Sequence, residues 1–165
     1  MALSEKIFTF HLDGLFLGID VNEVHEVLPT QALTPVPLAH PIVAGLINMR
    51  GQIVVAIDLR RFLRRPAHPV DQRLPINVIV RNGTNLMSLL VDHMGDVIEI
   101  DSGLFTKPPD TTATETRSLF RGAYQLPSQL LLVFDTTRAI EAIVSQATSK
   151  VLQSGHESNP PSDRR

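Results

Sequence analysis

"GLINMRGQIVVAIDLRRFL", residues 45–63, has a second version in the same chain, "GAYQLPSQLLLVFDTTRAI", residues 122–140. The two stretches align without a gap, with these matched pairs: Gly45 and Gly122, Gln52 and Gln129, Asp58 and Asp135, Leu63 and Ile140. Each stretch predicts a strand, a turn, a second strand and an aspartate that can cap a helix. Further upstream, "VHEVL" (24–28) and "MGDVI" (94–98) match in the same order. Two matches in one order indicate an internal duplication.

A hairpin precedes each copy of this pattern. Alternating apolar residues predict strands at 7–12 and 15–20 around Asp13-Gly14, and at 76–81 and 85–92 around Asn82-Gly83. Both dipeptides favour two-residue turns, because such turns need positive φ angles. Further strands are predicted at residues 45–49, 52–58, 119–126 and 130–135. On the strand at 52–58 we expect one buried face, formed by Ile53, Val55 and Ile57.

The sequence therefore predicts a mainly β fold of two pseudo-symmetric, five-stranded, SH3-like β-barrels packed together. We expect one barrel per half, at about residues 6–65 and 74–145, within a single domain of residues 1–152. Asp58 predicts a short helix at 59–64 after the first half, and Thr136 or Thr137 begins a C-terminal helix. Residues 153–165 are polar and aperiodic, which is typical of a disordered tail.

The composition argues against several classes of protein. The 165 residues include no cysteine, which excludes disulfides, thiolate metal sites and a cysteine nucleophile. The net charge of -2 and the 5% of aromatic residues do not provide the basic surface and stacking platforms of a nucleic-acid binder. We find neither a signal peptide nor an apolar run of about 18 residues, so we expect a soluble, cytoplasmic protein with no direct membrane insertion.

Arginine occurs at two places that need an explanation. Arg50 interrupts an apolar hairpin, and the equivalent position in the second half is Pro127. A solvated turn charge is the simpler interpretation, and a partner that meets the guanidinium is the alternative. The stretch "LRRFLRR" holds four more arginines, Arg60, Arg61, Arg64 and Arg65. We interpret them as a solvated helix face, with an acidic partner or nucleic acid as the alternative.

Histidines beside carboxylates are the candidate metal ligands. In an extended segment, however, His25 and Glu26 point to opposite faces, and His93 beside Asp92 belongs to no HExxH or similar spacing. The GxSxG, P-loop and GxGxxG motifs do not occur in the sequence. We therefore predict no metal site, no cofactor and no enzymatic activity.

"NEVHEVLPTQALTPVPLAHPIVAGLINMRGQIVVAIDLRRFL" (residues 22–63) resembles the signature of the CheW family, the coupling proteins of bacterial chemotaxis. The shared pattern includes valine-x-glutamate-valine, a valine-proline, glycine, asparagine, arginine-glycine, and a strand ending in aspartate-leucine-arginine. "SLLVDHMGDVIEI", "KPP" and "LFRGAYQL" followed by "LLLVFD" continue the pattern in order. The resemblance covers roughly residues 6–144.

The resemblance implies an adaptor with two partners. These are the cytoplasmic tip of methyl-accepting chemotaxis receptors and the regulatory domain of a CheA-type histidine kinase. It places Arg50, with its turn neighbours Asn48 and Gly51, at or beside the receptor contact. It also places four residues near a groove between the barrels: Val24, Glu26, Gly45 and Met94. A small-barrel nucleic-acid-binding protein remains the alternative on architecture alone, and an enzyme with an unrecognised site ranks third.

Overall fold

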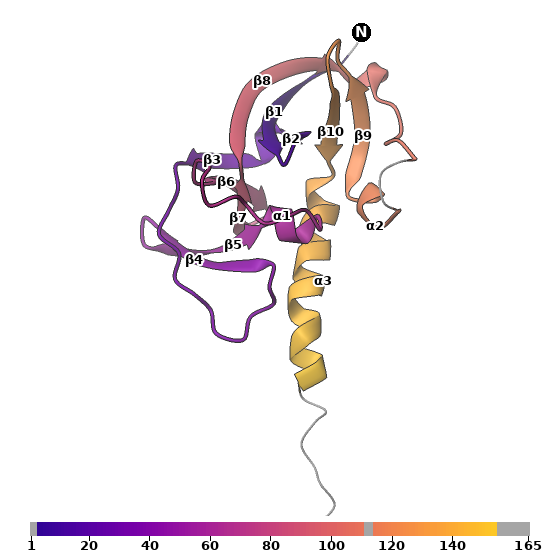
Figure 1. Ribbon diagram of the computed structural model, residues 1–165. Coiled ribbons are helices and arrows are strands. Elements are labelled where there is room, and N and C mark those ends of the chain that lie inside the picture. The colour runs from indigo at the N-terminus through magenta and orange to yellow at the C-terminus, as the bar shows by residue number, and fades with distance from the viewer. Residues whose placement is uncertain (1–2, 111–113, 155–165) are drawn as a thin grey trace, which may run out of the picture.

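The computed structural model describes residues 3–110 and 114–154. These residues form two five-stranded sheets and a long C-terminal helix that runs beside both (Figure 1). The strands are β1 (Ser4–Leu12), β2 (Leu15–Asp20), β3 (Val24–Leu28), β4 (Val43–Met49), β5 (Gln52–Asp58), β6 (Ile76–Asn82), β7 (Asn85–Val91), β8 (His93–Asp101), β9 (Phe120–Gln125) and β10 (Leu130–Phe134). The helices are α1 (Leu59–Phe62), α2 (Thr114–Arg117) and α3 (Thr136–Ser154), with 3-10 turns η1 (Val21–Glu23) and η2 (Ser102–Leu104). The predicted mainly β fold is confirmed.

The two sheets have equivalent strand orders. The first barrel is β8-β1-β2-β10-β9, and the second barrel is β3-β6-β7-β5-β4. In each barrel a tight hairpin lies next to a parallel strand, β2 with β10 and β7 with β5. The duplication seen in the sequence is therefore a pseudo-symmetry of the fold.

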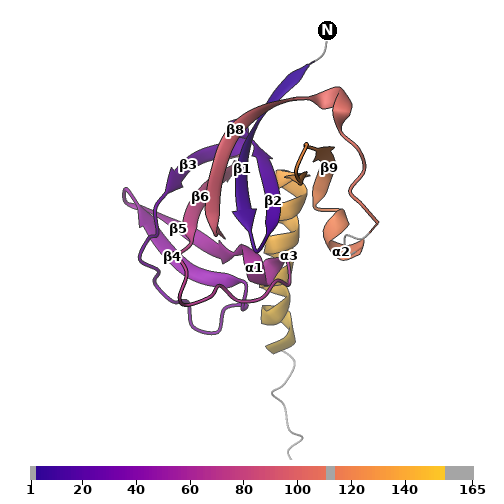
Figure 2. The ribbon, with the colours of Figure 1, turned by 45° about the horizontal axis from the view of Figure 1, so that its top comes forward.

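The assignment of one barrel to each half of the sequence is wrong. After its hairpin each half crosses over, so that β3 pairs with β6 of the other half and β8 returns to pair with β1. Figure 2 shows β8 as a long curved strand that crosses from the second barrel to the first. Each barrel thus combines the hairpin of one half with three strands of the other. A repeat pattern identifies equivalent strands, but it cannot tell which copy of the hairpin a strand will join, since both copies offer similar edges.

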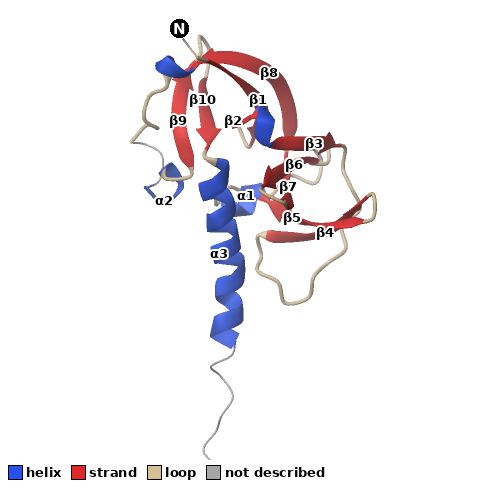
Figure 3. Ribbon diagram, turned by 180° about the vertical axis from the view of Figure 1, so that it is seen from behind, coloured by secondary structure: helices blue, strands red, loops and turns tan. Residues whose placement is uncertain are grey.

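The main hydrophobic core lies between the barrels and under α3. It includes Phe10, Ile57, Phe134 and Ile143, all at most 3% exposed. Smaller clusters fill the barrel interiors, around Phe16 and Leu131 in the first and around Ile47, Val54 and Ile79 in the second. Because the shared core is larger than either interior, neither barrel is a self-contained unit. Figure 3 shows α3 passing along the junction of the two barrels.

The buried face expected on β5 is also partly wrong. Val54 and Ala56 fill the interior of the second barrel, at 1% and 0% exposed. The opposite face consists of Ile53, Val55 and Ile57. The first barrel covers this face only at Ile57, whereas Ile53 is 61% and Val55 37% exposed. Both faces of "IVVAI" are apolar, so alternation alone could not tell which face enters the barrel.

The helix caps agree with the sequence. Asp58 accepts a hydrogen bond from the Arg61 amide, and Asp135 accepts the equivalent bond from the Arg138 amide, both at 3.1 Å. Helix α3 begins at Thr136 as predicted, but it continues to Ser154, two residues into the segment predicted as a tail. The remainder of that prediction, 155–165, lies outside the described residues.

Candidate functional site

The turn between β4 and β5 holds Arg50 in an unusual conformation. Arg50 and Gly51 both have positive φ angles, 53° and 85°, as the two central residues of a type I′ hairpin turn require. The Gly51 amide donates a hydrogen bond of 2.9 Å to Asn48 Oδ1. A left-handed conformation costs a residue other than glycine roughly 1 kcal/mol, so the hairpin imposes it on Arg50. The turn thereby fixes the direction in which the arginine leaves the barrel.

The guanidinium of Arg50 meets a carboxylate of its own chain. Arg50 Nη2 lies 2.8 Å from Glu26 Oε1, and the side chains are 78% and 23% exposed. Glu26 belongs to β3, at the opposite edge of the same five-stranded sheet from β4. An exposed ion pair contributes at most about 1 kcal/mol, so this contact orients the two side chains more than it stabilises the barrel. Sequence reasoning named both residues but did not foresee their pairing.

Gly45 has a structural reason for being glycine. A Cβ atom at this position would lie 2.8 Å from the Thr34 carbonyl oxygen, and φ is 153°. The close approach lets Thr34 and Leu46 exchange two backbone hydrogen bonds of 2.8 Å. Its equivalent, Gly122, stands in the same relation to Thr106, which exchanges two bonds of 2.9 Å with Ala123. Gly45 thus holds the loop before β4 against the barrel.

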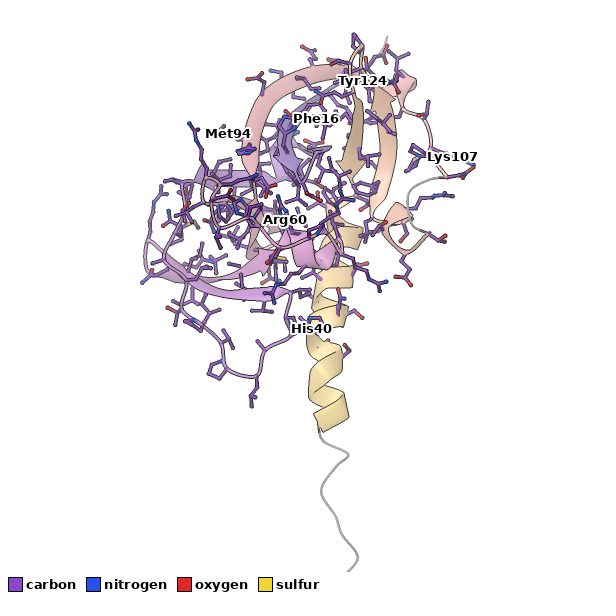
Figure 4. All side chains as sticks on the ribbon, viewed as in Figure 1. Phe16, His40, Arg60, Met94, Lys107 and Tyr124 are labelled. Carbon is purple, nitrogen blue, oxygen red and sulfur yellow. The ribbon has the colours of Figure 1, made fainter. Side chains whose placement is uncertain are left out.

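The remaining predicted site residues, Val24 and Met94, occupy the two crossover strands. Val24 begins β3 and is half-buried against the core between the barrels. Met94 follows the first residue of β8 and is 57% exposed (Figure 4). The turn, with Asn48, Arg50 and Gly51, is thus brought to Glu26, while Met94 lies on the sheet of the first barrel. Met94 and Arg50 therefore belong to different sheets.

The interpretation of the arginine cluster as a solvated face is wrong for Arg60. This side chain is 7% exposed and binds Asp92 through two bonds, Nε to Oδ1 at 2.9 Å and Nη2 to Oδ2 at 2.6 Å. Its Nη1 donates to the Pro66 carbonyl at 2.9 Å. Figure 4 shows Arg60 on α1, between the two barrels. A residue of α1 is therefore tied to the point where β7 passes into β8.

Asp13 extends this cluster to the β1–β2 turn. Its amide donates to Asp92 Oδ2 at 2.8 Å, and its carboxylate accepts from Arg65 Nε at 2.8 Å. Burial alone would raise the pKa of Asp92, but the hydrogen bonds from Arg60 and from the Asp13 amide outweigh it and hold that pKa below its ordinary value. The hydrogen bond to Asp92 in turn raises the pKa of Arg60. The cluster joins both barrels through ionised groups.

Each of the four arginines has an acidic partner. Arg61 pairs with Asp58 and Arg64 with Glu115, so the segment does not present a free cationic surface for nucleic acid. Sequence reasoning missed the Arg60–Asp92 pair. The available signal was weak: Arg60 lies between two apolar residues that a four-residue helix must bury, Leu59 and Phe62.

Other chemistry finds little support in the described part of the chain. Within it, no group of three or more histidine, aspartate or glutamate side chains is arranged to hold a metal ion. His25 instead lies with Nδ1 2.7 Å from Arg81 Nη2. No helix in the ranges 3–110 and 114–154 is long and apolar enough to cross a membrane.

Comparison with known proteins assigns the family. A model described as the CheW-like domain matches residues 6–144. The chain belongs to the CheW family. It is 26% identical over 143 residues to the chemotaxis protein CheW of Bacillus subtilis (strain 168), covering 87% of this chain and 91% of that protein. It is 28% identical to CheW of Treponema pallidum (strain Nichols), with 82% and 83% covered.

A solved structure agrees with the family assignment. The scaffolding protein TtCheW of Thermoanaerobacter tengcongensis superposes with a TM-score of 0.71 at 26% identity, covering 81% of this chain and 90% of that one. The chain is therefore a member of the CheW family, whose named relatives are proteins of chemotaxis signalling, and the resemblance read from the arginine-glycine turn and the flanking strands is confirmed.

Proposed function

We propose that this protein is a non-catalytic adaptor that couples methyl-accepting chemotaxis receptors to a CheA-type histidine kinase in a bacterial chemosensory array. The CheW-like domain and the scaffolding role of a structural neighbour support this proposal. The protein works in the cytoplasm and needs no cofactor, because an adaptor acts through its surfaces alone.

The observation that carries the proposal is the rigid presentation of Arg50. The side chain is 78% exposed, yet the type I′ turn, Asn48 and Glu26 fix its position. A receptor tip is a helical hairpin, and a helix that docks by apolar contacts is oriented by charges at the rim of the site. Arg50 and Glu26 offer such a pair of opposite charges. An incoming helix can replace their mutual contact with ion pairs to its own acidic and basic residues.

Three further residues are assigned to this receptor surface by proposal. Gly45 keeps β4 in position, and half-buried Val24 sets the course of β3 beside Glu26. Met94 supplies an exposed apolar side chain on the other crossover strand. The kinase regulatory domain, which resembles the adaptor itself, binds elsewhere on the barrels.

Charge reversal at Arg50 tests the proposal. We expect Arg50→Glu to retain the parental melting temperature but to lose most receptor control of kinase activity, with Arg50→Ala less affected. Receptor-stimulated phosphorylation is measured in a mixture of receptor, kinase and adaptor. Arg138→Glu is the matched control, because Arg138 is 66% exposed and also pairs with a carboxylate, that of Asp135. Full receptor control with Arg50→Glu contradicts the proposed role of this turn.

A further inference from the structure

A cavity lies between the first barrel and the segments around α1 and α2. Its volume is about 480 Å³, which is within the range of small-molecule sites. The apolar residues that line it are Leu15, Leu63, Pro109, Phe120, Leu130 and Leu132. The polar residues that line it are Arg64, Arg65, Glu115 and Thr116. The cavity therefore combines an apolar floor on the barrel with charged groups on the side of the two short helices.

The apolar floor belongs to the main hydrophobic core. Phe120 on β9 is 6% exposed and Leu132 on β10 is 8% exposed, and both are members of the core between the barrels. Leu15 and Leu130 are half-buried and pack against the same core. Because the sheet and the core hold these side chains in place, the floor is preformed. A hydrocarbon group that covers it is removed from water, which favours binding.

The backbone fixes Arg64 at the edge of this cavity. Helix α1 ends in a Schellman motif, in which the Arg65 amide donates to the Arg60 carbonyl at 2.7 Å and the Arg64 amide donates to the Arg61 carbonyl at 3.1 Å. The motif requires a left-handed residue, which is commonly glycine, and here that residue is Arg64, with φ 56°. Glycine would end the helix with less strain, so the arginine side chain needs an explanation other than the helix end.

Arg64 is also the cation that a ligand can reach. Its Nη2 lies 2.8 Å from Glu115 Oε2, and the two side chains are 72% and 70% exposed. Because such an exposed ion pair is weak, another carboxylate can replace that of Glu115. Arg65, by contrast, donates from Nε to the Asp13 carboxylate at 2.8 Å and from Nη2 to the Asp13 carbonyl at 3.1 Å. One exchangeable guanidinium favours a ligand with a single negative charge, and a planar carboxylate is the group that Arg64 already binds.

We propose that this cavity binds the anion of a medium-chain fatty acid, with its hydrocarbon chain on the apolar floor and its carboxylate on Arg64. A multiply charged anion fits less well, because Arg65 is engaged with Asp13. An uncharged apolar ligand would leave Arg64 unused. This inference goes beyond the proposed adaptor function and does not rest on it.

Replacement of Arg64 by glycine separates binding from folding. Because glycine suits the left-handed position, Arg64→Gly should melt at or above the parental temperature. It should lower the affinity for octanoate roughly 10-fold to 100-fold, as loss of a charge-assisted hydrogen bond implies, and leave the affinity for octanol unchanged. Both affinities are measured by NMR titration of the isotope-labelled full chain. Arg50→Gly is the matched control, because it removes another left-handed arginine with an exposed ion pair, on the second barrel, and should bind both compounds as the parent does.

A second variant fills the cavity itself. Leu130 is half-buried at the start of β10, so the indole ring of Leu130→Trp can lie over the apolar floor and should abolish binding of both compounds. Parental binding of octanoate by this variant overturns the proposal, because the ligand then lies elsewhere. Parental octanoate affinity in Arg64→Gly, or equal affinity of the parent for octanoate and octanol, overturns it as well.

Two further outcomes also contradict the fatty-acid site. A lower melting temperature in Arg64→Gly would make the arginine a structural residue of the helix end. An equal loss of octanoate binding in Arg50→Gly would show that binding depends only on net charge. The adaptor function is tested separately, by receptor control of the kinase, so its failure and the failure of this site are distinguishable.

Discussion

The second barrel ends its β4–β5 hairpin with Arg50 and Gly51, whereas the first barrel ends the equivalent β9–β10 hairpin with Pro127 and Ser128. Both turns have the same length, since the Leu126 amide bonds Gln129 as Met49 pairs with Gln52. Proline fixes φ near -65°, so the first barrel cannot adopt the left-handed turn that aims Arg50. The difference teaches that a hairpin of this length can be built without either residue, which leaves Arg50 free for the receptor contact proposed above.

A second difference lies at the crossovers. Where β7 passes into β8, buried Asp92 binds Arg60 of α1. Where β2 passes toward β3, half-buried Glu23 accepts a hydrogen bond from the Thr136 hydroxyl of α3. Both acids tie a crossover to the first turn of a helix, but only one forms a buried ion pair. In the repeat alignment Asp92 corresponds to Asn22 and Arg60 to Thr137, so the two crossovers are attached to helices through non-equivalent residues and different chemistry.

The largest difference in the effect of a substitution on stability is expected between Leu132 and Val55, which occupy equivalent positions of β10 and β5. Leu132 is 8% exposed in the shared core and Val55 is 37% exposed. Leu132→Asp buries an unpaired carboxylate and should cost more than about 4 kcal/mol, which unfolds the domain. Val55→Asp should cost about 1 kcal/mol. Urea midpoints measure both, and equal losses would show that the two outer faces are equally covered.

The second largest difference in the free energy of unfolding is expected between the two crossover acids, Asp92 and Glu23. Asp92→Ala leaves Arg60 charged and buried, with an expected loss of about 3–5 kcal/mol in the free energy of unfolding. Glu23→Ala removes one hydrogen bond and should cost about 1 kcal/mol. The comparison is made by chemical denaturation at neutral pH, with the cooperativity of each transition recorded. Comparable losses of unfolding free energy in the two variants would mean that the ion pair stabilises the fold no more than the single hydrogen bond of Glu23.

The Arg60–Asp92 ion pair also predicts how the stability of the fold decreases at acid pH. Because the pKa of Asp92 is lower in the folded protein, protons bind the unfolded chain more readily. Its stabilising contribution is therefore complete above the ordinary aspartate pKa of about 4 and declines as the pH falls through the folded value. Asp92→Asn should show a flatter decline in melting temperature below about pH 4 than the parent. Parallel curves would contradict the lowered pKa.

A smaller difference in stability is expected between alanine substitutions at Gly45 and Gly122, the two glycines that support a loop. Gly45→Ala forces a Cβ to within 2.8 Å of a backbone oxygen, and about 2 kcal/mol is expected. At Gly122 the nearest atom, at 3.0 Å, belongs to the Phe105 ring, which can move aside, so about 1 kcal/mol is expected. Thermal unfolding of the two variants decides the order. A reversed order would show that the loop before β4 yields more easily than the ring.

The smallest effect is expected at the turns themselves. Arg50→Gly relieves the left-handed strain and loses an exposed ion pair, so its stability should stay within about ±0.5 kcal/mol of the parent. Pro127→Gly gives the unfolded chain more freedom and should cost about 0.5–1 kcal/mol. Denaturant midpoints with matched slopes measure both. A large loss with Arg50→Gly would make the arginine a structural residue of the second barrel.

The sequence by itself determined the local elements and the duplication. Strands at 15–20 and 52–58, the Asp13-Gly14 turn and the caps at Asp58 and Asp135 were predicted correctly. These features depend on alternation, on positive φ angles and on hydrogen bonds between residues close in the chain, so the sequence displays them directly. The arginine-glycine turn likewise pointed to the family that the comparisons assign.

Only the tertiary structure decided which copy of the hairpin each crossover strand joins, and which face of β5 enters the barrel. It also decided that Arg60 is buried on Asp92 and that Arg50 meets Glu26. The two arginine contacts join residues 24 and 32 positions apart in the chain, and the crossover pairings join residues that are further apart still. Equivalent strands have nearly the same local pattern, so the choice between them is made by the shape and coverage of the shared core.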